Sequence, residues 1–183
     1  MRGRRKYMKW VAVSFAAVMA LTLPAACGES STPSATSTAS SDQEAHNSED
    51  VLFVLQLMQL SEQAMAISNV ALAKASSDAE YADAREAIRL NEERMTQARR
   101  LIVTWNAGDT EVPDAPGLLP EAQLDELLVA TGPDFKTKLA SAAETLSSGL
   151  STISGQELRA GQNALAKRLA SGVLVDTHAA VPS

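Results

Sequence analysis

Few residues in this chain of 183 residues have the chemistry for nucleophilic catalysis. Such catalysis needs a nucleophile, a general base and a group that orients the base. The chain has one cysteine, Cys27, and two histidines, His46 and His178. All three lie in segments that we expect outside the folded domain, and a single cysteine excludes an intramolecular disulfide. We therefore predict that the protein is not an enzyme.

Carboxylates offer a second kind of site. Glu62, Glu92 and Glu93 could approach one another from neighbouring helices. A di-iron bundle needs Glu-x-x-His repeats, however, and the sequence has none. We expect these glutamates to lie on solvated helix faces and to form surface pairs, such as Glu62 with Arg94.

Methionine thioethers are a third possibility, because they bind the soft ion Cu(I). Met58, Met65 and Met95 are the methionines that follow the N-terminal signal, and the first two share one helix face. Methionine is also a common core filler. We therefore expect no cofactor and no metal, with Cu(I) binding as the alternative. Asn91 either fixes helix register or forms the floor of a small pocket.

Helices must position these side chains, because the apolar residues recur at alternating steps of four and three. The pairs Leu60-Ser61 and Ile67-Ser68 return as Leu146-Ser147 and Ile153-Ser154, which indicates a pseudo-duplicated bundle. The expected inner faces are Phe53, Leu57, Leu60, Ala64, Ile67 and Ala71; Ala84, Ile88, Asn91, Met95, Ala98, Ile102 and Trp105; Leu139, Ala143, Leu146, Leu150 and Ile153; and Leu165, Leu169, Val173 and Leu174.

The fold class that we predict is all-α, a four-helix bundle with an extra short helix. An aromatic content of 4% and abundant Ala and Leu favour helices. Ser48 is the expected first cap, and Ser77 or Asp78 is the expected cap of the next helix. Thr177 to Ser183 is an expected frayed tail. The predicted helices cover residues 49–75, 78–105, 121–130, 134–154 and 164–175.

Residues 1–27 are organised as an export signal. A basic stretch, Met1 to Lys9, precedes an apolar run that is too short for a membrane span. The run ends in Leu23-Pro24-Ala25-Ala26-Cys27, which resembles a bacterial lipobox, although Pro24 stands where leucine is usual. This resemblance implies that Cys27 is lipidated and becomes the mature N-terminus. The alternative is ordinary cleavage that leaves a free thiol.

The export route has two readings. Arg4 to Lys9 resembles the twin-arginine consensus, whereas a merely basic segment would serve the general secretory route. Residues 28–48 are dominated by Ser, Thr, Ala and Pro, so we expect a disordered tether that O-glycosylation could modify.

The mature chain is strongly acidic. Five of the 16 Lys and Arg residues precede Cys27, which leaves 11 against 22 Asp and Glu and a formal charge of −11. Such a surface argues against nucleic acid and against electrostatic binding to anionic lipid.

Residues 50–64 resemble the first helix of a bacterial family, the domain of unknown function 305. Its pattern, D-x-x-F-x-x-x-M-x-x-H-H-x-x-A, is matched at Asp50, Phe53 and Ala64. The likeness continues at Trp105 and over Gly117 to Leu139. It implies a ferritin-like four-helix bundle over residues 49–177.

The departures from this family bear most directly on function. Some members are linked to copper or other metal handling, which two histidine pairs, a glutamate and a methionine could carry. Leucines at these positions would gain about 1.5–3 kcal/mol each from burial, so the resemblance implies a bundle whose metal site has decayed. The former ligand positions are Leu60, Ser61, Arg94, Ala98, Leu146 and Ser147.

The sequence thus predicts an exported, lipid-anchored protein on the extracytoplasmic face of the cell membrane, or a secreted one if Cys27 is not lipidated. Its expected role is binding or interaction, with an envelope protein as a possible partner and no nucleic acid. Metal handling through the three methionines is the alternative. Transport of an apolar ligand is a third reading, which needs an open cavity between the helices.

Overall fold

The computed structural model describes residues 45–177 and 182. The predictions for residues 1–44, including the signal, Cys27 and most of the tether, concern residues that the structure does not describe, and so does the prediction for His178. The described part of the chain is all-helical, without strands, as the sequence predicts. Its helices are α2 (Ser48–Lys74), α3 (Asp78–Trp105), α4 (Glu121–Val129), α5 (Gly132–Ala160) and α6 (Ala164–Asp176).

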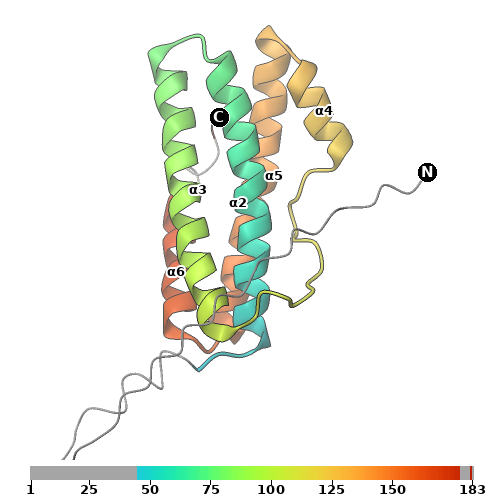
Figure 1. The fold of residues 1–183 in the computed structure, drawn as a ribbon. Helices are drawn as coiled ribbons and strands as arrows, with labels where there is room; N and C mark the ends of the chain where they lie inside the picture. Colours follow the sequence, from blue (N-terminus) through green and yellow to red (C-terminus); the bar gives the residue numbers. More distant parts are fainter. Residues whose placement is uncertain (1–44, 178–181, 183) are drawn as a thin grey trace, which may run out of the picture. The chain divides into compact units, whose positions relative to one another are not determined.

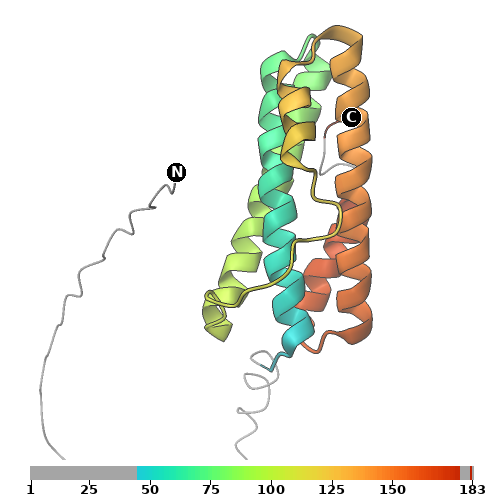
Figure 2. The same cartoon turned by 90° about the vertical axis from the view of Figure 1, so that its right-hand side faces the viewer.

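Four of these helices form a bundle around one apolar core. The helix α2 packs against both α3 and α5, and α6 packs against α5 and α3 to close the ring. The short helix α4 lies outside the ring and contacts α5 (Figures 1 and 2). Because α6 has 13 residues and α5 has 29, the fourth helix covers only the end of the bundle where α2 begins.

The stripe predicted for α2 is confirmed. Every member from Phe53 to Ala71 is buried, and Leu57, Leu60 and Ala64 are fully enclosed. By length and hydropathy α2 could also cross a membrane, but 56% of that stretch is buried inside the bundle. The whole described apolar core lies within residues 53–173. Residues 35–183 therefore contain what is needed to fold alone.

Three of the other predicted core positions are wrong. Ile88 is half-exposed on the outer side of α3, because Ala87 and Leu90 turn inward in its place. Leu165 and Leu174 are 36% and 38% exposed on α6. The short helix α6 contacts its neighbours less extensively than α2 does, so only part of its apolar surface is covered.

Local side chains set the ends of the helices. The cap of α2 is Asn47 rather than Ser48. Asn47 Oδ1 accepts hydrogen bonds from two backbone N–H groups, and the Asp50 carboxylate in turn accepts from the Asn47 N–H at 2.6 Å. The cap predicted at Ser77 is confirmed. The α6 cap is Asn163, whose Oδ1 accepts from the N–H groups of the first turn.

The predicted range of α5 is too short at both ends. The helix begins at Gly132, because Pro133 suits a first helical turn, and it continues past Ser154 to Ala160. The predicted frayed tail is also wrong in part. Thr177 is buried, with its hydroxyl donating to the Val173 carbonyl at 2.6 Å, and Pro182 is buried as well.

Glutamines on α2 pin the long connection between α3 and α4. Gln63 exchanges two hydrogen bonds with the backbone of Leu119, at 2.7 and 3.0 Å. One turn earlier, Gln59 accepts from the Ala115 N–H at 2.8 Å. Another turn earlier, Gln56 donates to the Pro113 carbonyl at 3.3 Å. The sequence reading misses this ladder, which fixes an irregular segment through its own backbone groups.

Candidate functional site

The positions that resemble a former metal site lie inside the bundle. Leu60, Ala98 and Leu146 are completely buried and belong to one apolar core. Ser61 is also completely buried, and among the described residues its hydroxyl oxygen has no hydrogen-bond partner. Ser147 is half-buried and donates to the Thr177 carbonyl at 3.4 Å. Hydrocarbon therefore dominates this region.

Arg94 does not form the surface pair with Glu62 that the sequence suggested. Its side chain is 4% exposed, and Nη2 donates to the Val173 carbonyl of α6 at 3.4 Å. Burial lowers the pKa of Arg94, and the nearby Asp176 carboxylate opposes that change. Arg94 thus ties α3 to the carboxyl end of α6, where a cation is favoured by the helix dipole.

The three methionines lie on two helices that pack together. Met95 on α3 is 3% exposed, whereas Met58 and Met65 on α2 are half-buried. Met58 packs against the apolar core. Core filling accounts for the environment of Met95 and Met58 without a metal ion.

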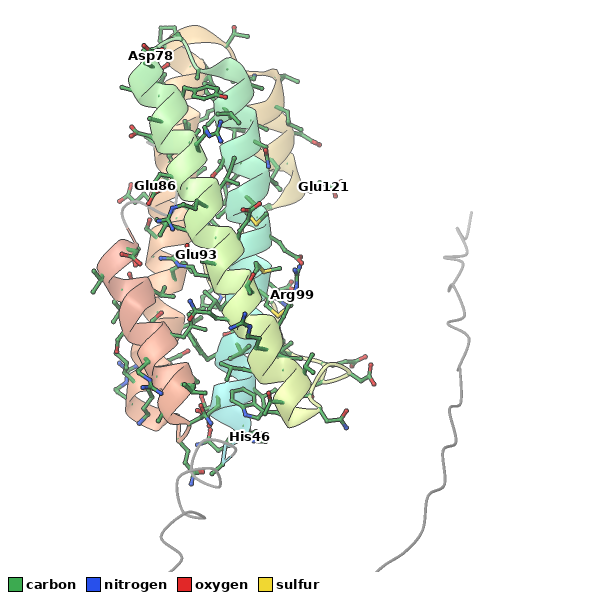
Figure 3. All side chains as sticks on the ribbon, turned by 60° about the vertical axis from the view of Figure 1, so that its left-hand side comes forward. His46, Asp78, Glu86, Glu93, Arg99 and Glu121 are labelled. Atoms are coloured by element: carbon green, nitrogen blue, oxygen red, sulfur yellow. The ribbon has the colours of Figure 1, made fainter. Side chains whose placement is uncertain are left out.

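The carboxylates singled out in the sequence are solvated. Glu62, Glu92 and Glu93 are all exposed, and Glu93 accepts from Arg89 at 2.6 Å. Figure 3 shows Glu86 and Glu93 on the outer side of α3. Within the described residues, no group of three His, Cys, Asp or Glu side chains is placed to hold a metal ion.

The acidic residues that the structure does bring together are Asp50 and Glu157, which the sequence reading misses. Asp50 is fully buried, and its carboxylate accepts from the N–H groups of Gln162 and Asn163 at 3.0 and 2.8 Å. These bonds join the first turn of α2 to the loop between α5 and α6. Asn47 Nδ2 strengthens the junction by donating to the Ala160 carbonyl at 2.9 Å.

Glu157 is 1% exposed and lies next to Asp50. Burial, with a further contribution from the neighbouring Asp50 carboxylate, raises the pKa of Glu157 to about 8. Glu157 therefore holds a proton at neutral pH in the folded chain. The absence of a side chain at Gly161 leaves room for the Glu157 carboxyl group, which a Cβ atom there would displace.

The carboxyl pair has an acid and a base, but substrate cannot reach it. Both side chains are buried, and the hollow beside Glu157 has no room for a water molecule. General acid–base catalysis requires the proton to meet the substrate within hydrogen-bond distance. The pair is therefore a structural contact that closes one end of the bundle.

His46 and Asn91 both make contacts within the fold. The His46 ring stacks on Trp105, with ring centroids 4.7 Å apart, at the end of the bundle where α2 begins (Figure 3). This contact places His46 against the fold rather than in a free tether. Asn91 is fully buried and donates to the Ala87 carbonyl of its own helix at 2.8 Å.

The larger hollows lie on the outside of the bundle. One of about 740 Å³ runs along α3 beside Arg85 and Arg89. Another of about 480 Å³ lies between α3 and α6, with Arg100 and Arg168 among its lining residues. Neither lies between α2, α3 and α5, where transport of an apolar ligand would need a cavity. A smaller hollow of about 170 Å³ does lie there, at the end of the bundle where α2 ends, and charged Lys74, Glu80 and Lys136 are among its lining residues.

No family model matches this chain, and no curated protein or solved structure matches it. The resemblance to the domain of unknown function 305 family therefore rests on the sequence motifs alone.

Proposed function

We propose that this chain is an exported, lipid-anchored binding or interaction protein of the cell envelope, without enzymatic activity. Its partner would be another envelope protein. The observation that carries the proposal is the hydrocarbon at the former ligand positions, since Leu60, Ala98 and Leu146 are fully enclosed in one core. A metal centre there would need polar donors that these side chains do not have.

The proposed anchor is Cys27, at the end of the lipobox-like segment. The described fold begins close to Ala45, so residues 28–44 would be the tether between the lipid and the bundle. A tether rich in Ser, Thr and Ala lets a bundle meet partners near the membrane surface without fixing its orientation. Such an arrangement suits recruitment of a partner rather than catalysis.

Mass spectrometry of the mature N-terminus tests the anchor. The full chain is produced in a bacterium that processes lipoproteins, beside a Cys27→Ser variant, and membranes are separated from soluble fractions. We expect the wild-type chain in membranes with a lipid-modified Cys27, and the variant without lipid. An unmodified Cys27 in a soluble wild-type chain would contradict the proposal. Equal helical content by circular dichroism would show that the substitution leaves the bundle intact.

A copper-handling protein is the second candidate. It is favoured by the placement of Met58 and Met95 on helices that pack against each other. Thioether ligands from two helices could hold Cu(I) if their sulfur atoms converge. Titration with Cu(I) separates this candidate from the first.

A further inference from the structure

The positive charges of the mature chain are unevenly distributed. Residues 94–108 and 158–175 contain six of its 11 Lys and Arg residues and no Asp or Glu. The two segments are the second half of α3 with the residues after it, and the end of α5 with most of α6. Because α3 and α6 pack together, an otherwise acidic molecule has one basic region.

The cations outside this region are already engaged. Arg89, Lys136 and Lys138 form ion pairs with glutamates at 2.6 to 2.9 Å. Lys74 donates to the carbonyls of Leu128 and Ala130. Arg85 lies over the ring of Tyr81.

Two arginines of the basic region differ in this respect. Among the described residues, neither Arg100 nor Arg168 forms an ion pair or a side-chain hydrogen bond, and both side chains are exposed. A guanidinium group has five N–H donors in a planar fork that fits phosphate oxygens. Two such groups are therefore available to an anionic ligand.

Arg100 and Arg168 line one groove, the hollow of about 480 Å³ between α3 and α6. Its apolar lining includes the buried Leu101 and Leu169 and the partly exposed Leu165. A groove with cations at the edge and hydrocarbon in the lining matches a ligand with an anionic head next to apolar chains.

The groove lies at the end of the bundle from which the tether leaves. Asn163, the cap of α6, donates to the Ala45 carbonyl at 2.9 Å, so the first described residue lies beside the start of α6. His46 and α6 lie at this same end (Figures 1 and 3). In a chain anchored through its N-terminus, the basic region therefore lies at the end of the bundle that is joined to the anchor.

We propose that the α3–α6 groove docks the bundle onto anionic phospholipid headgroups of the membrane to which the chain is anchored. Arg100 and Arg168 bind headgroup phosphates, and Leu165 meets the apolar edge of the headgroup layer. The net charge of −11 does not prevent this contact, because charges farther away than about 10 Å are screened by salt. The tether supplies the high local concentration that a weak contact needs.

This docking rests on the proposed lipid anchor, so its test uses an anchor that does not depend on the cell. Residues 27–183 are coupled through the thiol of Cys27, the only one in the chain, to maleimide lipid in vesicles. Vesicles of phosphatidylglycerol and phosphatidylcholine are compared with vesicles of phosphatidylcholine alone. An arginine-modifying reagent then reports the accessibility of Arg100 and Arg168, with Arg85 as the internal reference.

We expect modification of Arg100 and Arg168 to be several-fold slower on the anionic vesicles, with Arg85 unchanged. Inorganic phosphate without vesicles should not reproduce the protection. High salt should remove it, because surface electrostatics are screened. Equal modification on both kinds of vesicle, or protection that salt does not change, would overturn the proposal.

Single variants identify the residues that act. In an Arg100→Gln chain the modification of Arg168 is measured, and in an Arg168→Gln chain the modification of Arg100 is measured. Each charge near an anionic surface accounts for about a fivefold change in binding, so protection at the remaining arginine should fall by about that factor. An Arg85→Gln chain has the same net charge as either variant and should keep full protection. Loss of protection in that control would show an effect of net charge alone and would overturn the proposal that the α3–α6 groove is the docking surface.

The two proposals can fail separately. If Cys27 is not lipidated in cells but the coupled chain docks, the proposed anchor fails and the groove stands. If Cys27 is lipidated but the coupled chain does not dock, the groove fails and the anchor stands.

Discussion

At the scale of single residues, the carboxyl pair of Asp50 and Glu157 is the most unusual chemistry in the bundle. Asp50 holds the α5–α6 loop through backbone N–H groups, and Glu157 keeps a proton that solvent would ordinarily remove. Folding is therefore linked to pH at this point.

The pH dependence has a definite sign. The pKa of Glu157 is about 8 in the folded chain, against 4.5 for an ordinary glutamate. The folded state holds a proton that the unfolded state releases, so this contribution to stability is complete below pH 4.5. It is lost as pH rises through about 8. The free energy of unfolding should fall by a few kcal/mol, on the order expected for such a shift in pKa.

Urea unfolding of wild-type and Glu157→Gln chains across this pH range tests the linkage. Glutamine keeps a donor toward Asp50 and cannot titrate, so the variant should lose the fall in stability at high pH. The comparison between the two chains is needed because Glu80 also makes stability depend on pH. Lys136 lowers the pKa of Glu80 to about 2, so the contribution of Glu80 to stability is lost as pH falls rather than as pH rises. Glu49 and Lys167, which face Glu157, are unchanged in both chains. A Glu144→Gln chain, altered at an exposed glutamate of α5, is the control. Parallel pH profiles for wild type and Glu157→Gln would show that Glu157 is not protonated.

At the scale of elements, α5 touches the connection between α3 and α4 through glycine. A Cβ atom at Gly149 would overlap the carbonyl oxygen of Pro116, and Gly117, which is in close contact, has a φ of +84°. Both partners there are backbone, which cannot turn aside as a side chain can. Glycine at position 149 is thus a condition for this loop to lie on α5.

A pair of glycine substitutions tests this contact. Gly149→Ala should lower the free energy of unfolding by about 1–3 kcal/mol, because the overlap must be relieved by moving backbone. Gly172→Ala is the matched control, since a Cβ atom there meets nothing within 4 Å. It should raise stability by about 0.5–1 kcal/mol, the usual gain of alanine over glycine within a helix. Equal effects in urea unfolding would contradict the contact between α5 and the loop.

The glutamine ladder on α2 gives a second test at this scale. Gln63→Ala removes both side-chain bonds to Leu119 and should cost about 1–3 kcal/mol of unfolding free energy. Gln162→Ala, at an exposed side chain, should leave stability within about 0.5 kcal/mol of wild type. Faster proteolysis of residues 106–120 in Gln63→Ala would confirm that the loop has been released. Unchanged proteolysis would contradict a pinning role.

The sequence predicts these elements well where the signal is local. The stripe of α2, the cap at Ser77 and the start of α6 follow from spacing and capping residues nearby in the chain. The extent of α5 does not, because the buried Glu157 lies beside Asp50, which is 107 residues away in the chain. The burial of Arg94 likewise depends on the carboxyl end of α6. No periodicity within one helix contains that information.

At the scale of the whole molecule, net charge is a poor guide to the surface that a partner meets. The acidic sequence gives an expectation against anionic lipid. Yet Arg100 and Arg168, which form no ion pair among the described residues, line one groove at the end of the bundle where the described chain begins. The charge distribution depends on which helices pack together. It therefore becomes visible only once the bundle is assembled.

The central claim is that the bundle is a scaffold with an apolar core where a metal centre could have been. Titration of residues 35–183 with Cu(I) under reducing conditions, beside Cu(II) and Zn(II), tests it most directly. We predict no saturable binding of any of the three ions. Saturable Cu(I) binding that Met58→Leu or Met95→Leu abolishes, with helical content unchanged, would contradict the claim and establish metal handling.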